Sequence, residues 1–172
     1  MELEQAVENV LSFVGEITDQ PTRYKLVLLV GQDEDTRSSV IVKIIERTAY
    51  SRLDAGLMLS KRLLPIPETR RPLKASSEFK AIANEQLQQK TVLVIDNIGI
   101  LFDTSLQLSP LDLLEDISRF IPLIVSWPGS IAWNKDGTIH SLTHADPDDG
   151  EYKCYNHVHT SAVVDLNMES AQ

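Results

Sequence analysis

Residues 25–31 read Lys-Leu-Val-Leu-Leu-Val-Gly, an apolar run that ends in glycine, and Thr36, Arg37 and Ser38 follow shortly after it. Such a run suits a parallel β-strand that is buried on both faces. A phosphate-binding loop between strand and helix uses small residues whose N–H groups wrap the phosphates, a lysine that reaches the terminal phosphates, and a hydroxyl for magnesium. The positions of Gly31 and Ser38 therefore predict a P-loop-like order of strand, loop and helix.

The predicted loop departs from that pattern in its residues and in its charge. Arg37 stands where the pattern has lysine, and Thr36 stands where it has glycine. Residues 32–35 read Gln-Asp-Glu-Asp, and three carboxylates there would repel a polyphosphate. The fold signal is therefore stronger than the nucleotide signal. If Mg-ATP binds as a cofactor, the expected contacts are Gly31, Thr36, Arg37, Ser38 and Ser39.

A second apolar run, at 91–96, ends in Asp96 and is followed by Asn97. This arrangement has the form of a Walker B element, whose aspartate holds the magnesium ion, so Ser38 and Asp96 are the expected magnesium ligands. Hydrolytic P-loop proteins usually place an acid after that aspartate to orient the attacking water. Asn97 can hold a water but cannot accept its proton, so the sequence favours weak hydrolysis or none.

Two further residues are candidates for the same site. Ser126 lies near the end of a third apolar run, at 121–127, where P-loop folds place a polar sensor of the terminal phosphate, but a capped strand end also explains it. Arg119 could serve as an arginine finger, but a cation in the last turn of a helix is also expected from the helix dipole. We prefer the structural interpretation for both. If the site is catalytic, the candidate residues are Asp96, Asn97 and Arg119.

A nucleotide site that holds no magnesium would leave Asp96 without a cation. A carboxylate at the end of a buried strand is costly unless it is paired or hydrogen-bonded. Arg37 is the candidate donor, because its guanidinium could reach across the phosphate position, so we expect an Arg37–Asp96 ion pair there.

The order of the predicted elements indicates one α/β domain over residues 1–172. Its 172 residues and 42% hydrophobic content suffice for one core. We expect a P-loop NTPase-like (AAA/ASCE-like) layered fold with a mostly parallel central sheet and an edge hairpin. The predicted core covers about 22–166, after an amphipathic helix at 2–18 and before an acidic C-terminal tail. Strands are expected at 24–30, 49–53, 91–96, 121–127 and 162–166, helices at 38–48, 55–64, 76–89 and from 110, and the hairpin at 131–143, with Pro65, Pro67 and Pro72 interrupting regular structure.

Composition restricts the expected location and partners. The net charge of −9 argues against DNA as the main ligand, because non-specific DNA binding neutralises phosphates with Lys and Arg. The single cysteine, the absence of signal-peptide character in the first residues and the lack of an apolar run of about 20 residues predict a cytoplasmic protein without a membrane span.

Two other groups of residues are candidate sites. A zinc site would need thiolate and imidazole ligands, and such residues occur near the C-terminal end, but their spacing matches no compact motif. A basic cluster surrounds the prolines and is typical of a solvated face, with DNA or an acidic partner as the alternative. The zinc candidates are Cys154, His140, His144, His157 and His159, and the basic cluster is Lys61, Arg62, Arg70, Arg71 and Lys74.

Several blocks together resemble the BrxF family, the small P-loop-containing proteins of bacteriophage exclusion (BREX) defence systems. The most distinctive block is Asp-Asn-Ile-Gly-Ile-Leu-Phe-Asp at 96–103. It is followed by Ser-Pro-Leu at 109–111, Trp-Pro-Gly at 127–129, Asp-Gly at 136–137, Ala-Asp-Pro at 145–147 and Glu-Tyr at 151–152, and preceded by the runs at 59–64 and 71–73. The resemblance covers about 25–155.

The resemblance implies a role in bacterial antiviral defence, an AAA-like nucleotide-binding fold, and other defence proteins as partners. Matched by position, Gly31, Thr36, Arg37 and Ser38 fall on the family's phosphate loop and Asp96 on its Walker B acid. Our first interpretation is a subunit that acts by protein–protein interaction or regulation, with homo-oligomers expected from the amphipathic first helix and the edge hairpin. The alternatives are a genuine ATPase or nucleotide switch, in which Arg37 substitutes for lysine, and a DNA-binding accessory protein.

Overall fold

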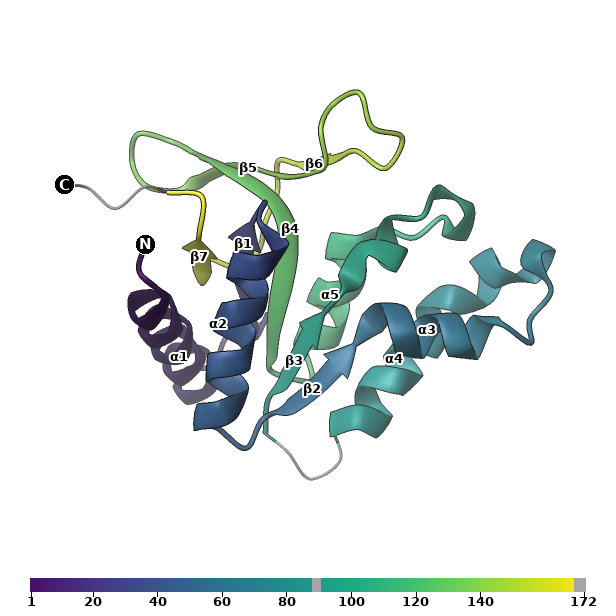
Figure 1. The fold of residues 1–172 in the computed structure, drawn as a ribbon, viewed down its shortest axis with the longest axis horizontal. Coiled ribbons are helices and arrows are strands. Elements are labelled where there is room, and N and C mark those ends of the chain that lie inside the picture. Colours follow the sequence, from purple (N-terminus) through teal and green to yellow (C-terminus); the bar gives the residue numbers. More distant parts are fainter. Residues whose placement is uncertain (88–90, 169–172) are drawn as a thin grey trace.

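The computed structural model describes residues 1–87 and 91–168 and shows an α/β fold (Figure 1). The helices are α1 (Leu3–Asp19), α2 (Glu34–Arg47), α3 (Ala55–Leu63), α4 (Arg71–Leu87) and α5 (Pro110–Ser118), with short 3₁₀ turns at Glu68–Arg70, Ile98–Phe102 and Thr104–Leu106. The strands are β1 (Leu26–Gly31), β2 (Ser51–Asp54), β3 (Leu93–Asp96), β4 (Leu123–Trp133), β5 (Ile139–His144), β6 (Lys153–Tyr155) and β7 (Val163–Asp165).

The predicted parallel sheet is confirmed, with the strand order β2-β3-β4-β1-β7 and parallel pairing throughout. Successive side chains of a strand point to opposite faces, so the continuous apolar run of β1 serves two cores. Leu26, Leu28 and Val30 pack with α3, α4 and α5, whereas Val27 and Leu29 pack with α1 and α2. Figure 1 shows these two groups of helices on opposite sides of the sheet.

Strand β4 belongs to two pairings at once, which corrects the predicted strand end at residue 127. Its first part is parallel to β1 and β3, and its second part, from Gly129, is antiparallel to β5. The indole of Trp127 donates a hydrogen bond to the carbonyl of Thr143 (3.0 Å), and a Cβ on Gly129 would lie 1.8 Å from the same oxygen. The predicted edge hairpin is thus present, but it continues the central strand instead of following it.

Helix α4 begins at Arg71, five residues before the predicted start at Ser76. Pro72 therefore lies in the first turn of a helix and does not interrupt it, because first-turn N–H groups need no partner within the helix. The Arg71 guanidinium donates to the carbonyls of Leu63 (3.1 Å) and Ile66 (2.9 Å), which joins the end of α3 to the start of α4. The two helices form a hairpin that projects to one end of the molecule (Figure 1).

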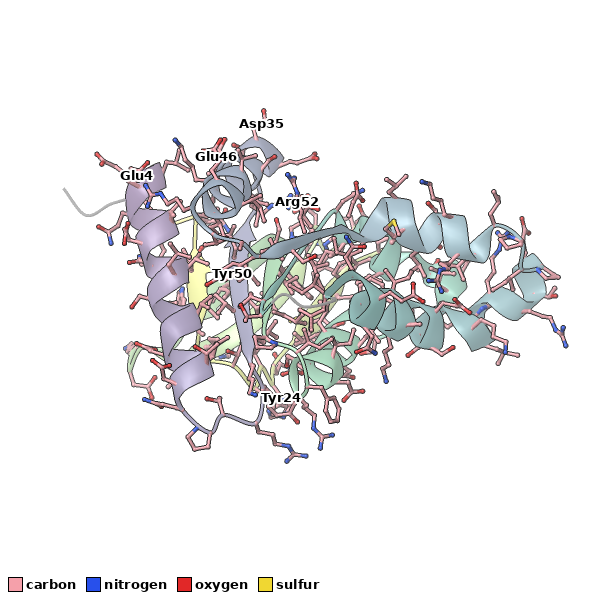
Figure 2. All side chains as sticks on the ribbon, turned by 90° about the horizontal axis from the view of Figure 1, so that it is seen from below. Glu4, Tyr24, Asp35, Glu46, Tyr50 and Arg52 are labelled. Atoms are coloured by element: carbon pink, nitrogen blue, oxygen red, sulfur yellow. The ribbon has the colours of Figure 1, made fainter. Side chains whose placement is uncertain are left out.

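Helix α1 buries its apolar stripe within this chain. Val7, Val10, Val14 and Ile17 are buried against α2, β1 and β7. Arg47 near the end of α2 makes ion pairs with Glu4 and Glu8, and Figure 2 shows Glu4 beside α2. The stripe therefore gives no reason to expect a second copy there. None of the described helices combines the length and the apolar character that crossing a membrane requires.

Candidate functional site

A cavity of about 270 Å³ lies where β1 and β3 end and where the parallel part of β4 passes into its antiparallel part, at the edge at which parallel α/β sheets bind ligands. It brings together five of the predicted site residues: Arg37, Ser38, Asp96, Asn97 and Ser126. Gly31, Thr36 and Ser39 are not among the residues that line it, and Gly31 is buried at the end of β1. The remaining lining residues are Glu34, Ile41, Ile98, Gly99, Pro128 and His144.

The connection between β1 and α2 is two residues long, Gln32 and Asp33, because α2 begins at Glu34. Asp33 is the N-cap, and its Oδ2 accepts hydrogen bonds from the N–H (3.2 Å) and the hydroxyl of Thr36. The hydroxyl contact is the main reason why the pKa of Asp33 is lowered. Helix N-termini attract anions, and here a carboxylate of the chain itself takes that position.

Arg37 is buried, with 9% of its surface exposed, and its side chain extends from α2 to Ser126 of β4. Its Nη1 donates to the hydroxyl of Ser126 (3.0 Å), whereas its buried Nε has no hydrogen-bond partner among the described residues. No carboxylate of the described residues comes within ion-pair distance of this guanidinium. Burial lowers the pKa of Arg37, and the charges of Glu34, Asp33 and Asp96 act in the opposite direction.

Asp96 is paired with Arg52, so the expected Arg37–Asp96 ion pair is wrong. Arg52 donates to Asp96 Oδ2 through Nη2 (2.6 Å) and Nε (3.1 Å). Strand β2 is the parallel neighbour of β3, with Arg52 opposite Val94 and Asp54 opposite Asp96. This register brings the Arg52 side chain to Asp96, and the carboxylate has its cation without any contribution from Arg37.

Asn97 holds the junction between β2 and α3. It adopts a left-handed conformation (φ 53°), its amide nitrogen donates to Asp54 Oδ1 (2.8 Å), and its carbonyl accepts from the N–H of Gly56 (2.9 Å). The same Asp54 oxygen caps α3 at Leu57. A Cβ on Gly56 would lie 2.5 Å from the Asn97 amide nitrogen, so the close approach needs glycine. These contacts give Asn97 a structural role at the rim of the cavity.

His144 was not predicted as part of this cavity. Its Nδ1 lies 2.8 Å from the carbonyl oxygen of Pro128, which can only accept, so Nδ1 carries the proton. The ring stacks on Phe102 at 3.5 Å between centroids. The β4–β5 pairing places His144 opposite Gly129, a long-range relation that no local pattern reveals.

The zinc candidates are not brought together. Across residues 1–87 and 91–168, no three His, Cys, Asp or Glu side chains are arranged to hold a metal ion. His159 instead contacts the buried carboxylate of Glu115 through Nδ1 (2.7 Å), and Cys154 is exposed.

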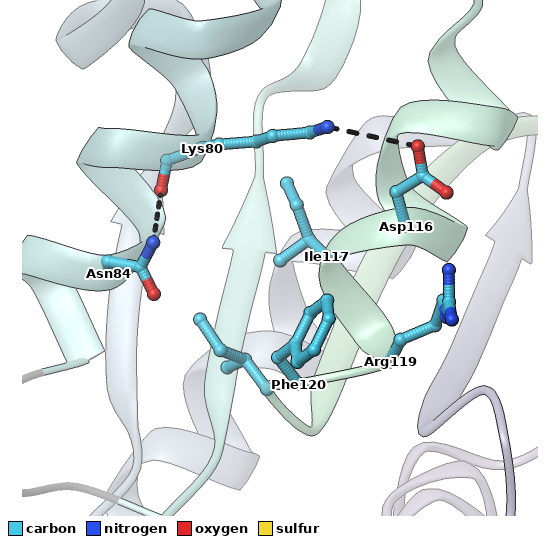
Figure 3. A pocket seen from close by; sticks show the side chains of 7 residues that line it. Lys80, Asn84, Asp116, Ile117, Arg119 and Phe120 are labelled. Atoms are coloured by element: carbon cyan, nitrogen blue, oxygen red, sulfur yellow. Dashed lines mark hydrogen bonds and ion pairs between the residues drawn. The ribbon is translucent and has the colours of Figure 1, made fainter.

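Arg119 lies outside the cavity, at a second hollow of about 380 Å³ between α4 and α5 (Figure 3). It is the C-cap residue of α5, just beyond the last turn, and its guanidinium lies over the Phe120 ring. The nearby charges, Lys80 and Asp116, form an ion pair (3.8 Å), and Asn84 bonds to the backbone of Lys80. The structure therefore does not bring Arg119 together with Asp96 and Asn97.

Comparison with family models, curated proteins and solved structures finds no match for this chain. The chemistry of the cavity must therefore be argued from its own residues. They are one buried cation with unused donors, one carboxylate paired with Arg52, the carboxylate of Glu34, and hydroxyl and imidazole groups at the wall. The donors of Arg37 can hold an anion, and the residue that follows Asp96, where a hydrolytic P-loop protein has its second acid, is the amide Asn97.

Proposed function

We propose that this chain is a P-loop-related subunit of a bacterial anti-phage (BREX-type) defence system, acting through protein–protein contacts with little or no nucleotide hydrolysis. The observation that carries the proposal is the Asp33 cap on α2. In a working phosphate loop, the N–H groups at this helix end face the phosphates. Here the Thr36 N–H is bonded to Asp33, and Glu34 and Asp35 add negative charge in the first turn.

The other groups that a nucleotide site would use are also bonded to other residues of this chain. The Asp96 carboxylate is bonded to Arg52, so a magnesium ion would have to displace a guanidinium. The amide nitrogen of Asn97 donates its hydrogen bond to Asp54. A polyphosphate would face Glu34 and Asp33 across the short loop, and like charges at close range disfavour its binding.

The α3–α4 hairpin offers the surface best suited to a protein partner. At its tip Leu64 and Leu73 are 76% and 80% exposed. The cations around them, Lys61, Arg70 and Lys74, make no ion pair among the described residues. Exposed leucines within unpaired positive charge fit an acidic protein surface with an apolar centre. A DNA backbone would use the cations but leave the leucines in water.

The defence context rests on the resemblance of the 96–103 block and its neighbours to BrxF proteins. In the structure this block forms the end of β3 and the turn Ile98–Phe102, so it supplies one wall of the cavity. If the proposal is right, the gene should lie among genes for phage-defence proteins. Its deletion should change the plating efficiency of phage on a host that carries the complete set.

The nucleotide part is tested by thermal unfolding with Mg-ATP and Mg-ADP. A ligand that binds only the folded state must raise the unfolding midpoint, so we expect no shift at millimolar nucleotide. A shift of several degrees would instead support the ATPase or nucleotide-switch alternative. A variant with a glycine-rich sequence at 32–36 and Arg37→Lys should gain binding if the fold is P-loop-related, because it removes the cap and the three carboxylates.

The interaction part is tested with the double variant Leu64→Glu/Leu73→Glu. Because both side chains are largely in water, we expect this variant to unfold like the parent protein. Its effect on phage plating should fall at least about tenfold, because the partner surface is lost. Val42→Glu, at a 41% exposed apolar position on α2, is the matched control and should keep the effect. Equal activity of all three proteins would exclude the tip as the partner surface, and binding of a short DNA duplex through Lys61 and Lys74 would support the DNA-binding alternative.

A further inference from the structure

We infer that the cavity at the ends of β1 and β3, beside the middle of β4, binds a small organic monocarboxylate through the Arg37 guanidinium. This inference goes beyond the proposed function, and its failure would leave that function untouched. It starts from an unusual state of one side chain. Arg37 is more than nine-tenths buried, lies at a cavity, and has no carboxylate partner among the described residues.

The unused donors of Arg37 form one edge of the guanidinium group. Nη1 is bonded to Ser126 at 3.0 Å, and this is the only hydrogen bond of the side chain within the part that the structure describes. Nε and Nη2 remain without a partner among the described residues, and this edge can hold a carboxylate side-on with two parallel N–H···O bonds. Nε is shielded from solvent, so a carboxylate first meets Nη2 and completes the pair when Nε opens to the cavity. The stem of Arg37 packs on Gly31, whose Cβ would lie 3.3 Å from Arg37 Cγ, so the side chain has little freedom to turn away.

The surroundings select a monoanion over a phosphate. The carboxylate of Glu34 lines the cavity. The charges of Asp96 and Arg52 cancel each other in their ion pair. Arg37 and Glu34 together then carry no net charge, so every negative charge on a ligand is repelled by Glu34, and a ligand with one charge meets less repulsion than a ligand with two. A phosphate near neutral pH carries more than one charge, and the N–H groups that would share it are capped by Asp33.

The volume and the lining residues of the cavity indicate what kind of group is attached to the carboxylate of the ligand. Ile41, Ile98 and Pro128 supply an apolar part, and the volume of about 270 Å³ admits a short side chain. A carboxylate on a small branched apolar body is therefore the expected class. Two sources present this chemistry: a free carboxylic acid, and the C-terminal residue of a polypeptide.

The test is thermal unfolding of the full chain with sodium isovalerate, N-acetyl-leucine, N-acetyl-leucinamide, inorganic phosphate and sodium chloride at equal ionic strength. We expect a carboxylate at about twentyfold its Kd to raise the midpoint by about 4–7 °C. The uncharged amide and chloride should give no shift, and phosphate should give less than isovalerate. A larger shift with N-acetyl-leucine than with isovalerate identifies a polypeptide C-terminus as the source, and the reverse order identifies a free acid.

Arg37→Met should abolish the carboxylate shift, and Arg37→Lys should weaken binding at least tenfold because it keeps the charge but loses the fork. Lys43→Met on the exposed side of the same helix is the control and should retain the shift. If the Arg37 variants fail to fold, the Arg37 Nε–H resonance of the parent protein replaces them, since the carboxylate should move it and slow its exchange. No shift with any carboxylate, an equal shift in Arg37→Met, a stronger response to phosphate, or an unmoved Nε–H resonance would each overturn the inference.

Discussion

Replacing Arg37 by methionine should make the protein more stable, although it deletes a hydrogen bond and a charge. A guanidinium that is 9% exposed has lost most of its hydration, and no described carboxylate forms an ion pair with it. The effective penalty for burying an ion is several kcal/mol, and replacing buried ionic groups by apolar side chains of similar size is often stabilising by about 1–4 kcal/mol. Methionine fills the space of the Arg37 stem against Gly31.

Two terms reduce this gain. Ser126, which is 3% exposed, loses its donor, and this costs about 1 kcal/mol. The attraction of Arg37 to Glu34, Asp33 and Asp96 is also lost. We therefore expect a net rise in the free energy of unfolding of about 1–2 kcal/mol, and a rise of the midpoint by about 2–8 °C. The double variant Arg37→Met/Ser126→Ala should be more stable again, because the orphaned hydroxyl is removed.

The measurement is urea unfolding followed by Trp fluorescence and far-UV circular dichroism. Arg47→Met is the matched control, because it removes an arginine of the same helix that is exposed and paired with Glu4 and Glu8, so it should lower the stability slightly. A loss of stability in Arg37→Met that equals or exceeds the loss in Arg47→Met would refute the reasoning. It would mean that the contacts of the buried guanidinium outweigh the loss of its hydration.

Three further predictions concern the same edge of the sheet. Asp96→Ala should cost only about 1 kcal/mol in chemical unfolding, because its partner Arg52 has 41% of its side chain exposed and can turn to water; a loss of 3–5 kcal/mol would indicate a buried partner instead. Gly129→Ala should lower the free energy of unfolding by at least about 3 kcal/mol, because the added Cβ would lie 1.8 Å from the Thr143 carbonyl oxygen. Gly15→Ala in α1, where the added Cβ meets no atom within 4 Å, should raise it by about 0.5–1 kcal/mol. Similar unfolding midpoints for the two variants would contradict this. The pKa of Asp33 is lowered in the folded state, so the stabilisation from its cap is fully present above the ordinary value of 3.8 and is lost as the pH falls through the folded value. The free energy of unfolding of Asp33→Asn should therefore differ most from that of the parent near neutral pH. A difference that grows in acid would contradict the assignment.

The sheet could be predicted from the sequence because its signals are local. The unbroken apolar runs of β1 and β3 indicate strands buried on both faces, and the structure buries them in this way. The turn at 134–137 with its Asp-Gly pair predicts the β4–β5 hairpin. The start of α2 could have been placed correctly from the same kind of signal, because Asp33 is a preferred N-cap residue and two acids follow it.

The partners inside the cavity could not be predicted, because they depend on strand register. Arg52 reaches Asp96 only because β2 is parallel to β3 with Asp54 opposite Asp96. His144 reaches the cavity only because β5 folds back along β4. Nothing in the chain near Asp96 distinguishes Arg37 from Arg52 as its cation, so the position of Arg37 in the phosphate-loop pattern favoured the wrong arginine.

The place of β1 in the sheet has a consequence for synthesis on the ribosome. Strand β1 is made early, but its two neighbours are β4 and β7, and β7 begins at Val163. At roughly 5–20 residues per second, β1 remains without its last neighbour for on the order of ten seconds after it is made. During that time an apolar strand with open edges is a template for pairing with other chains. Nascent chains of this protein should therefore depend on chaperones until β7 has left the exit tunnel.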